Sequence, residues 1–244
     1  MVNYGLKYAA AHKPQAVVLE NVAGLVKNHP TVYKHIIRSL RSIGHGFYKV
    51  SDAVLNTADH GLPQSRTRLY VVALSKACLG RTGKAFVFPQ PRAPLPLCSI
   101  LDMSHVGGDD DLPSDDIGLS NLSAAMEKLV RKGANPTKER PMYVADIYCG
   151  KGCCVHCTKD RFPCITASRA SAKGFWLCGL QRLTNLKELM MLQGVNPGRL
   201  NTTGISHRQL GMMCGNAMSI NVLTRLFARI LPIISDETPE DPWD

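Results

Sequence analysis

A carboxylate and an amide follow the first apolar run of the chain. In the stretch QAVVLENVAGLV, Glu20 and Asn21 come directly after a run rich in β-branched residues, which predicts a buried strand. Ligands of an open α/β sheet bind outside the carboxyl ends of its strands, so both side chains are candidates for a functional site. Taken alone, the stretch favours a more ordinary alternative, a solvated acid or an acid that caps the following turn.

A second polar pattern lies in the stretch HGLPQSRTRLYVVAL, where Gln64, Arg66 and Arg68 alternate into an apolar run. In a strand, side chains with a period of two project from the same face, so we expect two guanidinium groups and an amide to converge. Arginine binds phosphate oxygens and base carbonyls in a bidentate manner, which suits a nucleotide substrate. The alternative is the solvated face of an edge strand.

The elements that must position these side chains follow the order strand, helix, strand, strand over the first 75 residues. The segment HPTVYKHIIRSLRSIG has apolar residues at helical spacing and places Gly44 where a C-terminal cap belongs. Extended stretches, FYKVSDAVLN and RLYVVAL, come next. From Pro89 the chain becomes rich in proline and then acidic, and from Gln181 helical patterning returns in NLKELMMLQG and AMSINVLTRLFARIL.

Composition narrows the class of protein and its partners. The 244 residues are 45% hydrophobic and 20% charged, which is ordinary for a globular protein. A net charge of +10 favours a polyanionic partner such as nucleic acid, although a merely soluble basic protein is the alternative. The sequence has no signal-peptide pattern and no apolar run near the roughly 20 residues of a membrane span. With nine cysteines, an odd number, we expect a reducing compartment, the nucleus in a eukaryote or the cytoplasm in a bacterium.

Several motifs, in order along the chain, resemble those of the DNA cytosine-5 methyltransferases. LENVAGL resembles their Glu-Asn-Val motif, and PQSRTR resembles their Gln-x-Arg-x-Arg motif. RLTNLKELMMLQGVNP resembles the motif that braces the target recognition domain, and CGNAMSINVL resembles the closing Gly-Asn-Ser/Ala motif. PLPLCSILD and FPCITAS resemble parts of the recognition domain. The resemblance spans nearly the whole chain, and the ordered set is far more specific than any single motif.

The resemblance implies a reaction in which a cytosine is flipped out of the duplex and methylated at C5 by S-adenosylmethionine. A cysteine thiolate adds to C6, because C5 alone is a poor nucleophile. Glu20 would hold the base edge at N3 and the exocyclic amine, where developing negative charge must be neutralised. Arg68 would hold the cytosine O2, Arg66 would serve the same pocket or an adjacent phosphate, and Asn21 would orient the loop.

The resemblance assigns further residues to binding. Asn216 and Ala217, which we expect to open the last helix, would lie against the cofactor, S-adenosyl-L-methionine. The remaining positions that we assign to substrate or DNA binding are Gln64, Thr166, Arg169, Gln193 and Gly194. The implied partner is DNA, and the sequence assigns no metal ligand.

The implied fold is α/β. It is the second half of a doubly wound, Rossmann-like methyltransferase domain that depends on S-adenosylmethionine, with a small inserted target recognition domain. Residues 1–88 would form the partial catalytic domain and residues 89–178 the recognition module. Residues 179–234 would return to the catalytic domain, and residues 235–244 would form a polar tail.

Two family motifs do not occur in the 244-residue sequence: the Phe-x-Gly-x-Gly turn that cradles the cofactor, and the Pro-Cys-Gln loop that supplies the thiolate. Cys164 follows a proline, but its neighbours match the recognition domain, so we expect it to be structural. The sequence therefore predicts a truncated enzyme that is inactive alone and needs a complementing chain. Two alternatives stay open: a DNA-binding accessory pseudoenzyme, and an RNA cytosine-5 methyltransferase that acts on tRNA.

A cysteine cluster occurs in CGKGCCVHCTK, which contains Cys149, Cys153, Cys154, His156 and Cys157. The Cys-x-x-Cys spacing within it is that of a zinc knuckle, but a structural zinc site usually needs a second, more distant pair. We expect a loop of reduced cysteines, and a compact zinc site is the alternative.

Overall fold

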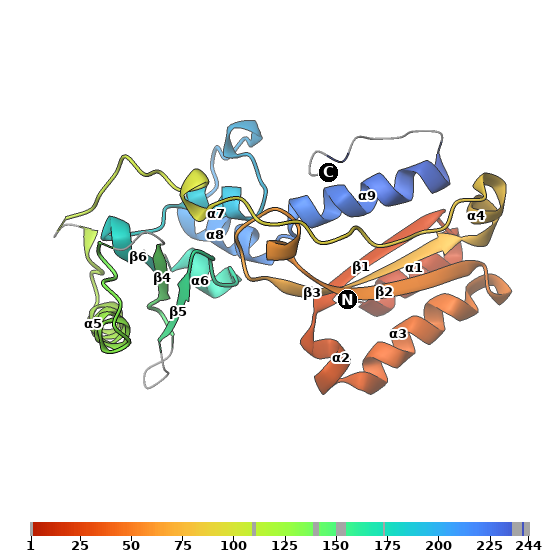
Figure 1. Cartoon of the computed structure of the whole chain (residues 1–244). Coiled ribbons are helices and arrows are strands. Elements are labelled where there is room, and N and C mark those ends of the chain that lie inside the picture. Colours follow the sequence, from red (N-terminus) through yellow and green to blue (C-terminus); the bar gives the residue numbers. More distant parts are fainter. Residues whose placement is uncertain are drawn as a thin grey trace. The chain divides into compact units, whose positions relative to one another are not determined.

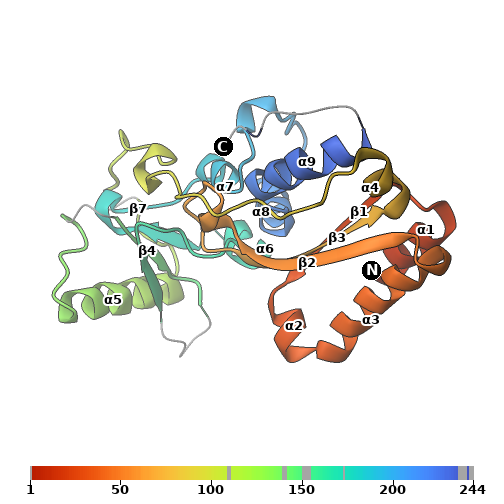
Figure 2. The ribbon, with the colours of Figure 1, turned by 45° about the vertical axis from the view of Figure 1, so that its right-hand side comes forward.

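The computed structural model describes residues 2–108, 111–138, 142–149, 155–172, 174–235 and 241. The chain divides into two compact units, whose elements are labelled in Figures 1 and 2. The first unit comprises residues 1–56, 67–92 and 222–244, and the second comprises residues 57–66 and 93–221.

The first unit is built on a sheet of three strands, β1 (Ala16–Val22), β2 (Tyr48–Asn56) and β3 (Thr67–Ser75). Their order is β1-β3-β2, and β3 runs antiparallel to both neighbours. The central strand β3 is an almost continuous apolar run, as expected for a strand that is covered on both faces, and its residues from Leu69 to Ser75 are buried.

Helices cover both faces of this sheet (Figure 1). On one face, Leu69 and Val71 pack with the apolar sides of α1 (Val2–His12) and α3 (Pro30–Ser42). On the other face, alternate residues of β3 pack against α9 (Ile220–Ile234). The period of two along β3 thus divides the apolar core of this unit into two layers.

Helix α3 forms where the spacing of its apolar residues predicts it. Pro30 stands in its first turn, where the missing N–H costs nothing, and Ile36, Ile37 and Leu40 are buried against the sheet. The helix ends at Ser42. Gly44, expected as its cap, instead lies in the short turn η1 (Ile43–His45) with a φ of 56°.

The second unit has a four-stranded antiparallel sheet in the order β5-β4-β6-β7. Its strands are β4 (Tyr143–Asp146), β5 (His156–Lys159), β6 (Phe175–Leu177) and β7 (Arg182–Leu183). On one face, Ala145 and Trp176 pack with α5 (Asp116–Arg131), and on the other, Val144 and Phe175 join a core that includes Leu189 and Leu192. The helices near that core are α6 (Ala167–Ser171), α7 (Leu186–Leu192) and α8 (His207–Asn216).

The shorter elements complete the described chain. They are α2 (Gly24–Asn28), α4 (Lys76–Thr82), η2 (Thr57–Asp59), η3 (Leu97–Ser99), η5 (Cys178–Leu180) and η6 (Pro197–Arg199). No single helix among the described residues is long and apolar enough to cross a membrane.

The division of the chain differs from the sequence-based boundaries. The recognition module was expected to end at residue 178, but the second unit runs to residue 221 and includes residues 57–66. The physical reason is that Leu180, Leu189 and Leu192 are buried in the same core as Phe162 and Phe175. Of the expected polar tail, only Ser235 and Asp241 lie among the described residues.

Candidate functional site

Glu20 and Arg68 lie on the same face of the sheet in the first unit. Glu20 stands opposite Tyr70, and Arg68 is two positions from Tyr70 along β3, so its side chain points to the same face. Oε1 of Glu20 lies 3.0 Å from Nε of Arg68, and each side chain is 15% exposed. The structure thus places a largely enclosed ion pair at the carboxyl end of β1.

This pair presents an acceptor and a donor next to each other. Oε1 of Glu20 is buried and has no hydrogen bond among the described residues, although Nε of Arg68 is close enough for an ion pair. An ionised carboxylate only accepts hydrogen bonds, whereas a guanidinium only donates them. The two groups therefore suit a ligand that carries an amino group and a carbonyl oxygen on nearby atoms.

Asn21 fixes the backbone where β1 ends. Its Oδ1 accepts a hydrogen bond from the backbone N–H of Val22 at 2.8 Å. Its neighbour across the ladder is Leu69, so its side chain starts from the face opposite that of Glu20. Asn21 thus acts on the backbone and lies apart from the ion pair.

Gln64 and Arg66 do not share a strand face with Arg68, so that expectation is wrong. Strand β3 begins at Thr67, and both residues precede it in the second unit. The backbone at these residues does not pair with β1 or β2. The N–H of Gln64 donates to the carbonyl of Leu62, and the N–H of Ser65 donates to that of Phe162. Gln64 thus forms an isolated parallel bridge with Phe162 and does not belong to β3.

The guanidinium of Arg66 is held by backbone carbonyls. Nη1 donates to the carbonyls of Ile165 at 2.7 Å and Gly215 at 3.3 Å, and Nη2 donates to that of Ala217 at 2.7 Å. The residue is 3% exposed. Arg66 therefore joins the segment before α6 to the end of α8, in place of the expected contact with a base or phosphate.

Gln64, Gln193 and Gly194 also serve the interior of the second unit. Nε2 of Gln64 donates to the carbonyl of Leu192 at 3.0 Å and to Oε1 of Gln193 at 3.3 Å. Nε2 of Gln193 in turn donates to the carbonyl of Cys214 at 2.9 Å. Both glutamines are 0% exposed, and Gly194 adopts a φ of 79° that suits glycine. These residues stabilise the turn after α7. The two glutamine side chains could contact a substrate only by leaving the core.

Thr166 precedes, and Arg169 lies within, the short helix α6, which packs closely on α8. A Cβ atom on Gly215 would lie 2.3 Å from the backbone nitrogen of Ala167, so only glycine permits this approach. Thr166 is exposed, and its hydroxyl lies 3.4 Å from that of Ser168. Arg169 is instead paired with Asp146, with 2.8 Å between Nε and Oδ1.

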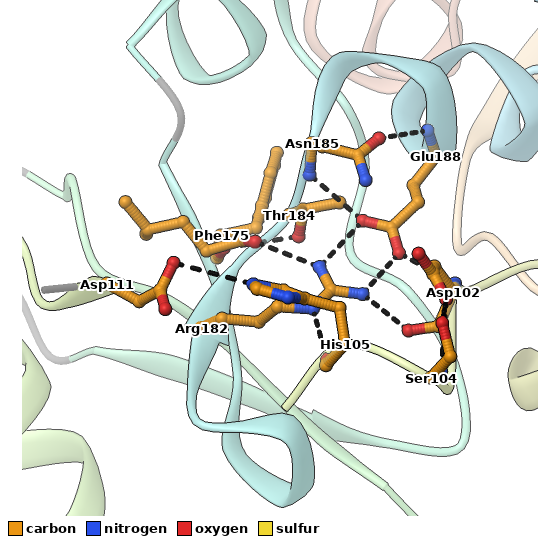
Figure 3. A network of polar contacts seen from close by, with 10 residues as sticks. Asp102, Ser104, His105, Asp111, Phe175, Arg182, Thr184, Asn185 and Glu188 are labelled. Carbon is orange, nitrogen blue, oxygen red and sulfur yellow. Dashed lines mark hydrogen bonds and ion pairs between the residues drawn. The ribbon is translucent and has the colours of Figure 1, made fainter. Parts of the chain in front are cut away.

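Sequence reasoning did not include Arg182 and Glu188 among the site residues. Figure 3 shows Arg182 in the centre of a polar network, with Nη2 2.6 Å from Oε1 of Glu188 and Nη1 3.0 Å from Oε2. Arg182 also donates to the carbonyls of His105 and Asp102. Glu188 is the third residue of α7 and closes a capping box with Asn185, the N-cap of the helix. The signal was present in the Leu-Thr motif, whose arginine and glutamate are six residues apart.

Residues 2–232 match the sequence profile of the C-5 cytosine-specific DNA methylases. The chain belongs to this family. Among curated relatives, the type II methyltransferase M.HaeII of Haemophilus aegyptius is 28% identical over 214 residues, which are 87% of this chain and 59% of the relative. M.NgoBI of Neisseria gonorrhoeae is 29% identical over 215 residues, 86% of this chain and 59% of the relative. The chain thus spans less than two thirds of the length of these methylases.

Solved structures show the same fold. The methyltransferase EhMeth of Entamoeba histolytica superposes with a TM-score of 0.57 at 17% identity, over 95% of this chain and 68% of that one. A mutant of DNMT2 from Spodoptera frugiperda gives a TM-score of 0.56 at 17% identity, over 96% of this chain and 71% of that one. The predicted fold class, part of a methyltransferase α/β domain with an inserted module, is therefore confirmed.

The two residues expected at the cofactor of this C-5 methylase chain do not open its last helix. Asn216 is the last residue of α8, Ala217 is its C-cap, and α9 begins at Ile220. The sequence pattern suggested one continuous helix from Ala217 onward. In the structure, Ser219 lies between α8 and α9, where it is buried and its hydroxyl bonds to that of Thr57. Asn216 is exposed, and the carbonyl of Ala217 is used by Arg66.

The described thiols of this methylase chain are mostly enclosed. Burial raises the pKa of Cys178 to about 12 and that of Cys214 to about 11. Cys153 and Cys154 of the predicted cluster lie outside the described residues, whereas Cys149 is buried and Cys157 partly buried. Within the described part of the chain, no three His, Cys, Asp or Glu side chains come close enough to hold a metal ion.

Proposed function

We propose that this chain is the part of a DNA cytosine-5 methyltransferase that holds the flipped cytosine and carries the recognition module. The observation that supports this most is the ion pair of Glu20 and Arg68, 3.0 Å apart at the carboxyl end of β1. Cytosine carries an exocyclic amine, a ring nitrogen and a carbonyl oxygen along one edge. That edge matches an acceptor next to a donor.

In the proposed reaction, a cysteine thiolate forms a bond to C6, and negative charge develops at N3 and O2 of the ring. Oε1 of Glu20, which lacks a hydrogen bond among the described residues, accepts one from the exocyclic amine. The guanidinium of Arg68 donates to O2. The contact from Arg68 strengthens as the charge grows, which lowers the barrier to thiolate addition, while Glu20 holds the base in place through its amine. Asn21 holds the backbone beside them.

Membership of the family implies a methyl donor of the S-adenosylmethionine type, which supplies the methyl group that C5 receives. Asn216 and Ala217 do not make up a cofactor site by themselves, because one is exposed and the carbonyl of the other already accepts from Arg66. These two residues therefore have no part in the proposed reaction. The glycine turn expected to cradle the donor does not occur in the 244-residue sequence.

The nucleophile also has to come from elsewhere, since the sequence contains no Pro-Cys-Gln loop. We propose that a polypeptide segment outside these 244 residues supplies both the loop and the glycine turn. For the 244 residues alone we expect no methyl transfer and weak cofactor binding. Detectable methylation of DNA by this purified chain would contradict that expectation.

Complementation tests the proposal. The chain is coexpressed with a segment that carries a Pro-Cys-Gln loop and a Phe-x-Gly-x-Gly turn, and transfer of a labelled methyl group is measured with duplex DNA and with tRNA. We expect copurification and transfer to duplex DNA. Transfer to tRNA alone would favour the RNA enzyme, and a complex that binds DNA without any transfer would favour the accessory protein. Either result would overturn the proposed function.

A further inference from the structure

The N-terminal part of the first unit is strongly basic. Residues 1–52 contain seven Lys and Arg residues and only two acidic residues, Glu20 and Asp52. Both acids are engaged: Glu20 pairs with Arg68 on the α9 face of the sheet, and Asp52 accepts a hydrogen bond from the hydroxyl of Tyr33 at 2.8 Å. The hydrogen bond to Asp52 leaves its charge in place, but the cations of this segment outnumber it, so the α1 and α3 layer carries a net positive charge.

Three of these cations form a stripe on the outer side of α3. Lys34, Arg38 and Arg41 follow one another at intervals of four and three residues, and all three are exposed. Residues at this spacing lie on one side of a helix. At 1.5 Å per residue, the stripe extends over about 10 Å. We call these three residues the α3 stripe.

Two further cations lie where the stripe ends. A Cβ atom on Gly44 would lie 3.6 Å from Nζ of Lys13, and one on Gly46 would lie 3.3 Å from Nζ of Lys76. The carbonyl of Arg41 lies beside the same turn, 3.9 Å from the Cβ position of Gly46. Both ammonium groups thus border η1, where the helix of the stripe ends.

The exposed surface of α5, unlike that of α3, carries acidic residues beside its cations. On α5, Arg131 pairs with Glu127 at 3.4 Å, and acidic residues stand at the beginning of the helix. A basic residue in the last turn of a helix, such as Arg41, also stabilises the helix dipole, but that effect is confined to the last turn. It does not account for Lys34 or for Lys13 and Lys76. Mutual repulsion among these cations is relieved if an anionic partner binds them.

We propose that the α3 stripe, with Lys13 and Lys76, binds the phosphate backbone of duplex DNA. The surface lies on the α1 and α3 side of the sheet, whereas Glu20 and Arg68 lie on the α9 side. It is therefore a second DNA contact, separate from the cytosine-holding pair. Contacts with phosphates do not depend on the base sequence. Flexible cations on a convex helix suit phosphate contact of this kind. The proposal does not depend on methyl transfer.

Binding of a labelled 30-base-pair duplex to the 244-residue chain tests this, measured by fluorescence anisotropy over a range of salt concentrations without any methyl donor. The test variant is K34Q/R38Q/R41Q. A matched control, R131Q/K132Q/K138Q, removes the same charge from exposed residues around the end of α5. A third variant, K34R/R38K/R41K, keeps every charge of the stripe. Circular dichroism and the fluorescence of the buried Trp176 check that each variant is folded.

We expect the test variant to lose about tenfold or more in affinity at low salt. The slope of log affinity against log salt should become shallower by about 2 to 3, because each phosphate contact contributes about 0.9. The charge-conserving variant should bind like the unmodified chain. Equal losses in the test variant and the α5 control would show that only net charge matters and would overturn the proposal. A loss confined to single-stranded RNA, with duplex binding unchanged, would overturn the assigned partner.

Discussion

Arg182 and Glu188 form a bidentate ion pair in the interior of the second unit, with their side chains 3% and 1% exposed. Each end of the pair has further partners: the backbone N–H groups of Asp102 and Asn185 donate to Glu188, and Arg182 donates to the carbonyls of Asp102 and His105. The pair thus ties residues 102–105 to the start of α7. A buried pair with this many partners is costly to break from one side.

Removing one partner of this pair should destabilise the second unit strongly. We expect Arg182→Met or Glu188→Met to lower the free energy of unfolding by about 3 kcal/mol or more, because the remaining charge stays buried without its partner. Chemical denaturation followed by the fluorescence of Trp176 measures this, in a Trp243→Phe background that leaves one tryptophan.

Two comparisons make that experiment decisive. The double variant R182M/E188M should be more stable than the sum of the two single losses predicts, since no unpaired charge remains. Glu127→Gln breaks an exposed pair with Arg131 and should change the stability by less than about 1 kcal/mol. Additive single losses would contradict the coupling.

Gly215 should not tolerate even one added methyl group. Its Cβ would lie 2.3 Å from backbone atoms of Thr166 and Ala167, so Gly215→Ala must push α6 away from α8. We expect a loss of about 1 to 3 kcal/mol in the stability of the second unit. Gly80→Ala is the matched control in α4, where no atom lies within 4 Å, and should be neutral or stabilise by up to about 1 kcal/mol. Similar unfolding midpoints for both variants would contradict the close packing.

The hydroxyl of Tyr148 donates to the carboxylate of Asp115, and this contact should make stability depend on pH. Burial, together with that bond, raises the pKa of Tyr148 from 10 to about 12. Its contribution is therefore complete below pH 10 and is lost as the pH rises towards 12. The stability difference between the unmodified chain and Tyr148→Phe should shrink between pH 9.5 and 11.5. A constant difference would show that folding does not raise the pKa of Tyr148.

Asp115 gives the opposite dependence at low pH. The bond from Tyr148 lowers the pKa of this carboxyl below its ordinary value of 3.8. Its contribution is present above the pKa of the unfolded chain and is lost as the pH falls through the lowered pKa. Denaturation curves from pH 5 to pH 2 should show a smaller acid-induced loss for Tyr148→Phe. An identical loss in both proteins would show that Tyr148 does not lower the pKa of Asp115.

Thiol alkylation should separate the cysteines by exposure. Cys98 is exposed and should react with iodoacetamide at pH 8 within minutes. Cys178 and Cys214 are buried, and their raised pKa values of about 12 and about 11 leave little thiolate at that pH. Peptide mass spectrometry after brief labelling measures the order. Early modification of Cys178 would contradict the core that the structure describes.

The apolar pattern predicted the elements of the first unit but not their partners. The β-branched run before Glu20 and the apolar run after Arg68 form β1 and β3 as expected. Their antiparallel pairing, which places Glu20 across from Tyr70, depends on register between distant segments. No local pattern in the sequence specifies that register.

Short-range alternation was misleading at Gln64 and Arg66. Their spacing matches a strand, yet both residues precede β3 in the second unit, where Gln64 forms an isolated bridge with Phe162. Gln64 donates to the carbonyl of Leu192 at the end of α7, and Arg66 donates to carbonyls before α6 and on α8. Because these partners are distant in the sequence, only the folded chain reveals the contacts. Asn216 and Ala217 were misplaced for a related reason, since the break before α9 depends on a buried contact of Ser219 with Thr57.

The most direct test of the account is the rate of methyl transfer to duplex DNA by the complemented enzyme that carries Glu20→Gln. Glutamine keeps the size of the side chain but loses the charge that pairs with Arg68. We expect the single-turnover rate to fall by about 100-fold or more, with duplex affinity within about threefold of the unmodified enzyme. Glu127→Gln serves as the control and should leave the rate unchanged. A Glu20→Gln enzyme that transfers methyl groups at the unmodified rate would contradict the assignment of the site.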